Sequence, residues 1–107
     1  MTQTDIAWAA GLYEGEGSLT KRTDRTTWQL AIRSTDLDVL QKFLNIFDVG
    51  SIHFCTAPSL KPHWKPIWQY AVSNKGGMHK ILTAILPHLG SRRAYKALNF
   101  LDYFDKV

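Results

Sequence analysis

Several segments of this chain alternate apolar and polar residues, which is the pattern of β-strands that bury one face. Leu30 and Ile32 fall on one side of such a segment and Arg33 on the other, and residues 50–56 and 67–73 alternate in the same way. Successive side chains of a strand point to opposite faces of the sheet. An apolar sheet face must be covered, so we expect helices on that side and an open polar face on the other.

The order of the segments predicts an α+β fold. Residues 18–34 have the pattern of a hairpin with its turn at 23–26, and residues 57–66 contain three prolines, which is typical of a loop. Helices are predicted where apolar residues recur with helical spacing, over residues 4–13, where Thr4 or Asp5 can be the N-cap, and over 35–47, 78–89 (after the glycines 76 and 77) and 91–104. The chain is therefore predicted to be a single domain, residues 1–107, with one four-stranded antiparallel sheet.

The composition is that of a folded, basic protein. Thirteen Lys and Arg against nine Asp and Glu give a net charge of +4, the balance expected of a polyanion binder. Cys55 is the only cysteine, which excludes an intrachain disulfide and a multi-cysteine zinc site. There is no apolar run of about 20 residues and no signal-peptide layout. We expect a soluble, intracellular protein without a membrane partner, in the cytoplasm or in an organelle if it is organelle-encoded.

The first predicted helix has a stripe of small residues. At 100° per residue, Ala7, Ala10, Gly11 and Glu14 share one side, and the large residues around the rest would dock on the core. Small residues are useful where another backbone must come close. A glycine inside a helix costs roughly 1 kcal/mol relative to Ala, which favours this interpretation, although the alanines can equally be ordinary helix formers.

This helix is followed by two acids that alternate with two glycines, Glu14-Gly15-Glu16-Gly17. Acids are unfavourable at the negative end of a helix dipole, so a positive group is expected nearby. The glycines are predicted to end the helix and to let another strand or a ligand approach closely. If two stripes pack across a two-fold axis, Glu16 of each chain comes near its copy.

These residues resemble a known motif, because AAGLYEGEG at positions 9–17 is similar to the LAGLIDADG motif of homing endonucleases. The element order is similar to that family's αββαββα fold over almost the whole chain, and VGSI at 49–52 and LPHLGSRRAYK at 86–96 have counterparts there. The matches to the motif are Ala10, Gly11, Leu12 and Gly17, and the departures are Ala9 for leucine, Tyr13 for an aliphatic residue, and Glu14 and Glu16 for aspartates.

The resemblance implies a homodimer with a divalent metal. Single-motif members pair through small residues of the motif helix, which here implies an interface of Ala7, Ala10, Gly11 and Glu14. Glu16 matches the acid that binds the cation, and the carbonyl of Gly15 would add a second oxygen ligand. Mg²⁺ is the expected cofactor, Ca²⁺ or Mn²⁺ can substitute in binding, and no small-molecule cofactor is expected. Glu14 matches an acid that is not a ligand, so hydrogen bonding at the helix end or interface is its expected role.

The resemblance also places a basic residue beside the scissile phosphate, just before the last helix. Arg92 aligns best and is predicted to be catalytic together with Glu16, while ordinary phosphate anchoring is an equal alternative for Arg92. Arg93 follows it. Ser34 ends the second strand, where relatives have a glutamine that orients water.

The open polar face of the sheet is predicted to read DNA. Arg and Gln can make paired hydrogen bonds to guanine and adenine, respectively. Each residue alone could be an ordinary solvated strand residue, so the prediction depends on their common face. The predicted DNA-binding residues are Ser18, Thr20, Arg22, Gln29, Arg33, Ser34, His53, Gln69, Ser73 and Arg93.

Two functions in particular are compatible with these residues. The leading hypothesis is a homodimeric, Mg²⁺-dependent endonuclease that cuts a long pseudo-palindromic double-stranded DNA target, as in intron or intein mobility. The alternative is a non-cleaving nucleic-acid-binding module of the same fold, such as a transcriptional regulator or an RNA maturase. Glu16 with Arg92 favours the enzyme, whereas glutamate in place of aspartate and the small size favour the binding module. A third reading is a basic interaction domain that binds no nucleic acid.

Overall fold

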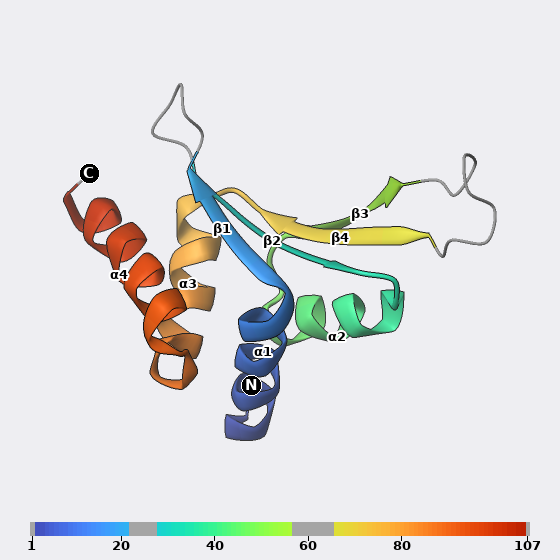
Figure 1. Cartoon of the computed structure of the whole chain (residues 1–107), viewed down its shortest axis with the longest axis horizontal. Coiled ribbons are helices and arrows are strands. Elements are labelled where there is room, and N and C mark those ends of the chain that lie inside the picture. Colours follow the sequence, from blue (N-terminus) through green and yellow to red (C-terminus); the bar gives the residue numbers. More distant parts are fainter. Residues whose placement is uncertain (1, 22–27, 57–65, 107) are drawn as a thin grey trace.

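The computed structural model describes residues 2–21, 28–56 and 66–106. Helices lie on one side of a single antiparallel sheet with strand order β1-β2-β4-β3 (Figure 1). This is the predicted α+β architecture. The predicted turn at 23–26 and residues 57–65 of the predicted loop lie outside the described residues. The elements are α1 (Gln3–Glu16), β1 (Gly17–Lys21), β2 (Trp28–Ser34), α2 (Leu37–Phe47), β3 (Ser51–Thr56), β4 (Ile67–Val72), α3 (Lys75–Ile85), the short 3₁₀ helix η1 (Leu86–His88) and α4 (Ser91–Lys106).

The register of the sheet aligns apolar side chains across neighbouring strands. Leu30 of β2 lies opposite Leu19 of β1 on one side and opposite Val72 of β4 on the other. Tyr70 of β4 likewise lies opposite Ile32 of β2. These five side chains are at most 2% exposed. Burial of such a continuous apolar surface is the main force that holds the helices against the sheet.

Helix α2 packs aromatic side chains against the centre of the sheet. Phe43 packs against Tyr70 with ring centroids 4.9 Å apart, and Phe47 lies 5.0 Å from Phe43. The hydroxyl of Tyr70 donates to the Val49 carbonyl at 2.6 Å. Gly50 follows with φ +90°, and a Cβ there would lie 2.8 Å from the Tyr70 ring. The turn into β3 therefore requires glycine for both its conformation and its space.

Two helix starts differ from the sequence prediction. Helix α1 begins after Thr2, not after Thr4 or Asp5, because Thr2 and Asp5 form a capping box with hydrogen bonds of 3.0 and 3.2 Å. Helix α3 includes the two glycines that were expected to precede it. Its N-cap is Asn74, whose side chain accepts a hydrogen bond of 2.5 Å from the Gly77 N–H.

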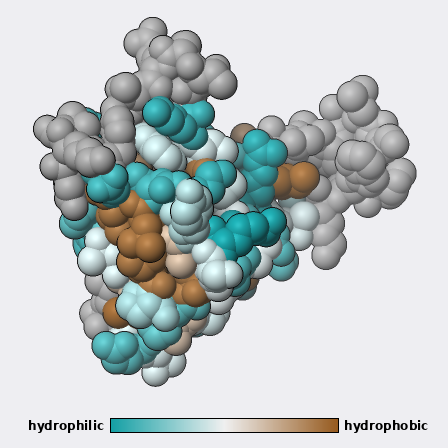
Figure 2. All heavy atoms as spheres, turned by 60° about the vertical axis from the view of Figure 1, so that its left-hand side comes forward, coloured by the Kyte–Doolittle hydropathy of each residue, from teal (hydrophilic) through white to brown (hydrophobic). Residues whose placement is uncertain are grey.

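Helix α4 lies at the edge of the domain and keeps part of its apolar surface exposed. Ala97 and Phe100 are buried, whereas Tyr95 and Leu98 are 69% and 52% exposed. The side of the molecule that includes α4 shows a run of hydrophobic surface flanked by hydrophilic side chains (Figure 2). Within the described ranges, each helix is too short or too polar to cross a membrane.

Candidate functional site

The junction between α1 and β1 is shaped by Tyr13 and Gly17. The N–H of Gly17 donates to the Tyr13 carbonyl and closes the helix, and β1 begins at the same residue. A Cβ on Gly17 would lie 2.3 Å from Cδ1 of the Tyr13 ring, well inside van der Waals contact, so only glycine fits here. The group that lies close to Gly17 is the Tyr13 side chain of the preceding helix turn, and the approach of another strand or a ligand stays a prediction. Gly15, in contrast, does not end the helix but lies inside it.

Glu14 is held by the beginning of α4. The N–H of Gly90 donates to Glu14 Oε1 at 2.6 Å, and Arg93 Nε lies 3.3 Å from Glu14 Oε2 in an ion pair. The amino-terminal end of a helix carries partial positive charge, so α4 and Arg93 together offset the unfavourable dipole of α1 at Glu14. Glu14 therefore forms hydrogen bonds and an ion pair at the end of its helix, and its predicted place in a dimer interface stays a prediction.

Arg93 joins three parts of this junction. Besides pairing with Glu14, its Nη1 donates to the Gly17 carbonyl, and its guanidinium lies over the Tyr13 ring, 5.6 Å from the centroid. Burial raises the pKa of Tyr13 to about 12, and the charge of Arg93 opposes part of this rise. Only 21% of the Arg93 side chain is exposed. The DNA contact predicted for Arg93 stays a prediction, with little surface available for it.

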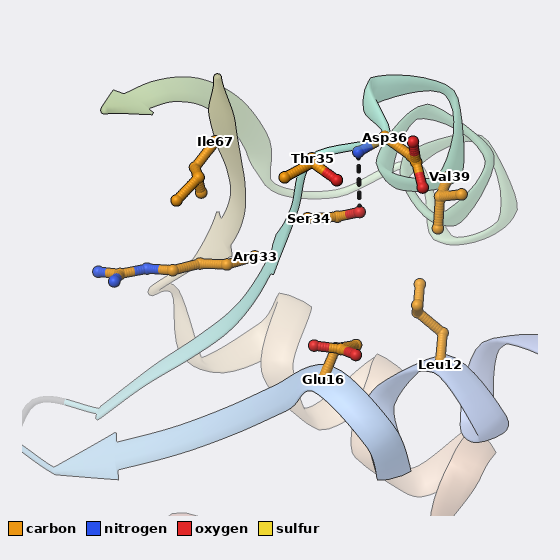
Figure 3. A pocket seen from close by; sticks show the side chains of 8 residues that line it. All are labelled: Leu12, Glu16, Arg33, Ser34, Thr35, Asp36, Val39 and Ile67. Carbon is orange, nitrogen blue, oxygen red and sulfur yellow. Dashed lines mark hydrogen bonds between the residues drawn. The ribbon is translucent and has the colours of Figure 1, made fainter. Parts of the chain in front are cut away.

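Glu16 lies beside an open hollow of about 520 Å³ where α1, β2, α2 and β4 meet (Figure 3). Glu16 is exposed, and no described residue donates a hydrogen bond to its carboxylate. The hydroxyl oxygen of Ser34 accepts from the Asp36 N–H at 3.0 Å, and its water-orienting or DNA-binding role stays a prediction. The residues that line the hollow with Glu16 are Leu12, Arg33, Ser34, Thr35, Asp36, Val39 and Ile67.

The other predicted catalytic residue, Arg92, lines a different hollow of about 330 Å³. It is exposed, at the first turn of α4. Lys96, one helical turn later, lines the same hollow, and sequence analysis did not single it out although its i, i+4 spacing from Arg92 is a usable signal. Ser18 borders this hollow and also a third one that contains Glu16. One chain therefore does not bring Glu16 and Arg92 into one cavity; they lie on either side of Ser18.

The oxygen atoms around Glu16 could supply some, but not all, of the ligands of a divalent cation. The last carbonyls of a helix lack intrahelical N–H partners, so the Gly15 carbonyl and the Glu16 carboxylate are both available as oxygen ligands. Mg²⁺ typically takes one or two protein carboxylates and completes its shell with water and phosphate. No group of three His, Cys, Asp or Glu side chains within the described residues is arranged to hold a metal. A cation at Glu16 would therefore need ligands from outside this chain.

Most of the predicted DNA-reading residues lie on the open face of the sheet. Arg33 of β2 lies directly opposite Gln69 of β4, and Gln69 lies directly opposite His53 of β3. Arg33 Nε donates to Gln69 Oε1 at 2.8 Å, and His53 Nε2 shares a hydrogen bond of 2.8 Å with Ser51 Oγ. These side chains form one polar row across the sheet. Their contact with DNA stays a prediction.

The remaining predicted reading residues are spread around this row. Ser18 and Thr20 are exposed on β1, and Gln29 is half-buried on β2. Ser73 is exposed just after β4 and lines a hollow of about 440 Å³ that also includes His53 and Gln69. Arg22 lies outside the described residues.

The small residues of α1 are divided between two sides. Ala10 is 1% exposed and packs in the core of its own chain, because it shares the buried side of the helix with Ala9 and Tyr13. It therefore has almost no surface to offer a partner. Ala7 and Gly11 are exposed, and so is Gly15, with nothing within 4 Å of a Cβ placed on either glycine. The exposed small stripe is thus Ala7, Gly11 and Gly15, and its pairing with a second chain stays a prediction.

The sequence matches no protein-family model and no curated protein. The fold, in contrast, is similar to solved structures of homing endonucleases. A structure of I-CvuI in complex with its target in the presence of calcium superposes with TM-score 0.76 at 17% identity, covering 97% of this chain and 68% of that one. The intron-encoded I-CeuI complexed with DNA superposes with TM-score 0.72 at 15% identity, and the match covers 97% of this chain and 55% of that one.

A third similar structure is the LAGLIDADG meganuclease I-AabMI bound to uncleaved DNA. Its TM-score is 0.73 at 16% identity, and the match covers 94% of this chain and 36% of that one. The chain therefore has the LAGLIDADG fold. It spans about a third to two thirds of the length of these three proteins.

Proposed function

We propose that this chain is a site-specific DNA endonuclease that cleaves double-stranded DNA as a homodimer with bound Mg²⁺. The observation that carries the proposal is the position of Glu16. Its carboxylate has no partner among the described residues and lies where the end of α1 borders the open polar face of the sheet. A carboxylate without a hydrogen-bond donor beside an open polar face is best explained as a ligand for a cation that DNA brings with it.

The roles of the residues follow from their positions. Glu16 and the Gly15 carbonyl would hold the cation, which supplies Lewis-acid charge neutralisation and a more acidic bound water. Arg92 and Lys96 would bind a phosphate on the other side of Ser18, where their charges offset the negative charge of the backbone. Arg33, His53 and Gln69 would face base edges. The exposed stripe of Ala7, Gly11 and Gly15 would let the α1 helices of two chains pack closely and bring a second Glu16 to the site.

A second function is favoured by one observation. Glu16 and Arg92 line separate hollows in the single chain, which suits a module that binds nucleic acid by its open face without cutting it. In that case Arg92 and Lys96 are phosphate anchors, and Glu16 contributes to neither binding nor chemistry.

The two functions are separated by incubating the protein with a randomised duplex library in Mg²⁺, in Ca²⁺ and in EDTA. The endonuclease is expected to bind selected sequences in Ca²⁺ and to cut them in Mg²⁺, and Glu16→Gln is expected to keep binding and lose cutting. Sequence-specific binding without cuts in Mg²⁺ supports the binding module. A monomer on DNA by light scattering would contradict the homodimer, and absence of salt-dependent DNA binding would contradict both functions.

A further inference from the structure

We propose that Arg33 and Gln69 form a preset reading pair that selects a guanine in the DNA target. The inference rests on the proposed DNA binding and deepens it, because it names the base that this part of the open face recognises. The pair is fixed by the sheet itself, since the two residues lie directly opposite each other on β2 and β4.

The pair is held by a single hydrogen bond with a defined direction. Arg33 Nε donates to Gln69 Oε1 at 2.8 Å. Arg33 is exposed, whereas Gln69 is half-buried between the hollow that contains Glu16 and the hollow that contains His53. The less mobile glutamine therefore orients the guanidinium of the more exposed arginine before any ligand arrives, which reduces the entropy lost on binding.

The hydrogen bond limits what Arg33 can recognise. With Nε occupied, the guanidinium can present only its two terminal nitrogens as an end-on fork of N–H donors. Guanine offers two adjacent acceptors in the major groove, O6 and N7, which match two parallel donors. Adenine pairs one acceptor with a donor, and thymine has one acceptor beside a methyl group. The orientation of Arg33 therefore favours guanine over the other bases.

The same hydrogen bond changes the expectation for Gln69. Reading adenine requires an amide to donate to N7 and to accept from N6, so both its oxygen and its nitrogen must be free. Gln69 Oε1 is engaged by Arg33, which leaves only the amide nitrogen as a donor. Gln69 thus acts as a positioning residue for Arg33 instead of an adenine reader.

The position of the guanine follows from the hollows that Arg33 lines. Arg33 borders both hollows that contain Glu16, whereas His53 lines a hollow without it. The selected guanine is therefore expected on the side of each half-site that is nearer to Glu16, and so nearer to the proposed cut.

Binding-site selection from randomised duplexes in Ca²⁺ tests the inference. The variants are Gln69→Met, which keeps the size but removes the acceptor, and Arg33→Met, which removes all the N–H donors of the side chain. Gln41→Met is the matched control, because it makes the same chemical change at an exposed position of α2, away from the open face of the sheet. The wild type is expected to enrich guanine at one position of each half-site. Gln69→Met should weaken this preference about tenfold, Arg33→Met should abolish it, and Gln41→Met should leave it unchanged.

Two results would overturn the inference while leaving the proposed function intact. One is a guanine preference that Gln69→Met leaves unchanged, and the other is an adenine preference that Gln69→Met abolishes. Both are read in variants whose thermal unfolding matches the wild type. If the folded wild-type protein shows no salt-dependent DNA binding, the proposed function fails and the inference fails with it.

Discussion

Glu14 and Glu16 are separated by one residue, and yet their surroundings are opposite. Both oxygens of Glu14 face the start of α4, where Gly90 and Arg93 hold them. Glu16 is exposed beside an open hollow and has no hydrogen-bond donor within the described part of the chain. The difference arises because two residues span about 200° of a helix, so consecutive acids of the motif point to different sides. A carboxylate that is already paired can hold the fold together, whereas an unpaired one is available to a ligand.

The sharpest test of this contrast is Glu16→Gln. We expect the rate of DNA cleavage in Mg²⁺ to fall by about 10²–10³, because a charge-stabilising group at the reacting phosphate is worth this much. The free energy of unfolding should stay within about 0.5 kcal/mol, since an exposed surface group is changed. Single-turnover cleavage and urea unfolding measure the two quantities. A large fall in the free energy of unfolding would show that Glu16, like Glu14, makes contacts that stabilise the folded chain.

The pH dependence of stability tests the packing of Tyr13 at the junction between α1 and β1. The pKa of Tyr13 is raised from its ordinary value of 10.0 to about 12 in the folded chain. Because the pKa of Tyr13 is higher in the folded chain than in the unfolded chain, the unfolded chain ionises first as the pH rises. The free energy of unfolding is therefore unaffected by the ionisation of Tyr13 below about pH 10 and falls as the pH rises toward 12. A rise of this size corresponds to about 2–3 kcal/mol. Urea unfolding between pH 9 and 12 measures it, and Tyr13→Phe should remove this share of the pH dependence.

The fit of Tyr13 on Gly17 is tested by Gly17→Ala. We expect the free energy of unfolding to fall by about 1–3 kcal/mol, because the new methyl group must displace a buried ring. Gly15→Ala is the matched control, since nothing lies within 4 Å of a Cβ at that position. Urea unfolding of both variants makes the comparison. Equal effects of the two substitutions would show that the ring does not decide the identity of residue 17.

Glu14→Gln should have the opposite profile to Glu16→Gln. We expect a loss of stability of about 1–2 kcal/mol, because the amide can still accept from Gly90 but leaves the partly buried Arg93 without its counter-charge. Cleavage should keep its Mg²⁺ dependence at a temperature where the variant is folded. Thermal unfolding and the cleavage assay are read on the same preparation. Loss of Mg²⁺-dependent cleavage with full stability would place Glu14 among the metal ligands.

The smallest expected effect is at Gly11. On an exposed helix side with free space around it, Gly11→Ala should raise the stability of the isolated chain by about 0.5–1 kcal/mol. If α1 pairs with a second chain through this side, the same methyl group should weaken the dimer. Unfolding at low protein concentration and sedimentation on DNA separate the two effects. A more stable chain with unchanged assembly would exclude Gly11 from the interface.

The sequence pattern was sufficient to predict the fold and to predict which side chains of each strand face the core. The alternation in β2 and β4 and the helical spacing in α2 depend only on local periodicity. The pattern was less informative for α1, whose small residues are distributed around the helix. Ala10 was grouped with Ala7 and Gly11, and only the packed chain shows that it faces the core. Helix starts were also displaced, since Thr2 and Asn74 compete with other capping residues nearby.

The contacts of individual functional side chains depend on distant parts of the chain, and sequence alone could not provide them. No local pattern links Glu14 to Gly90, or Arg33 to Gln69, because these pairs are brought together by tertiary packing and strand register. Lys96 is the exception, since its spacing from Arg92 on one helix face is visible in the sequence.

The hydrogen bond between Glu14 and Gly90 joins residues that are 76 positions apart in the chain. Closing so long a loop is entropically expensive, and such contacts form after local helices and hairpins. During synthesis, the end of α1 leaves the ribosome long before α4 exists to hold it. The motif at residues 9–17 is therefore translated before the residues that hold Glu14, and a chain interrupted before Gly90 has the motif without these contacts.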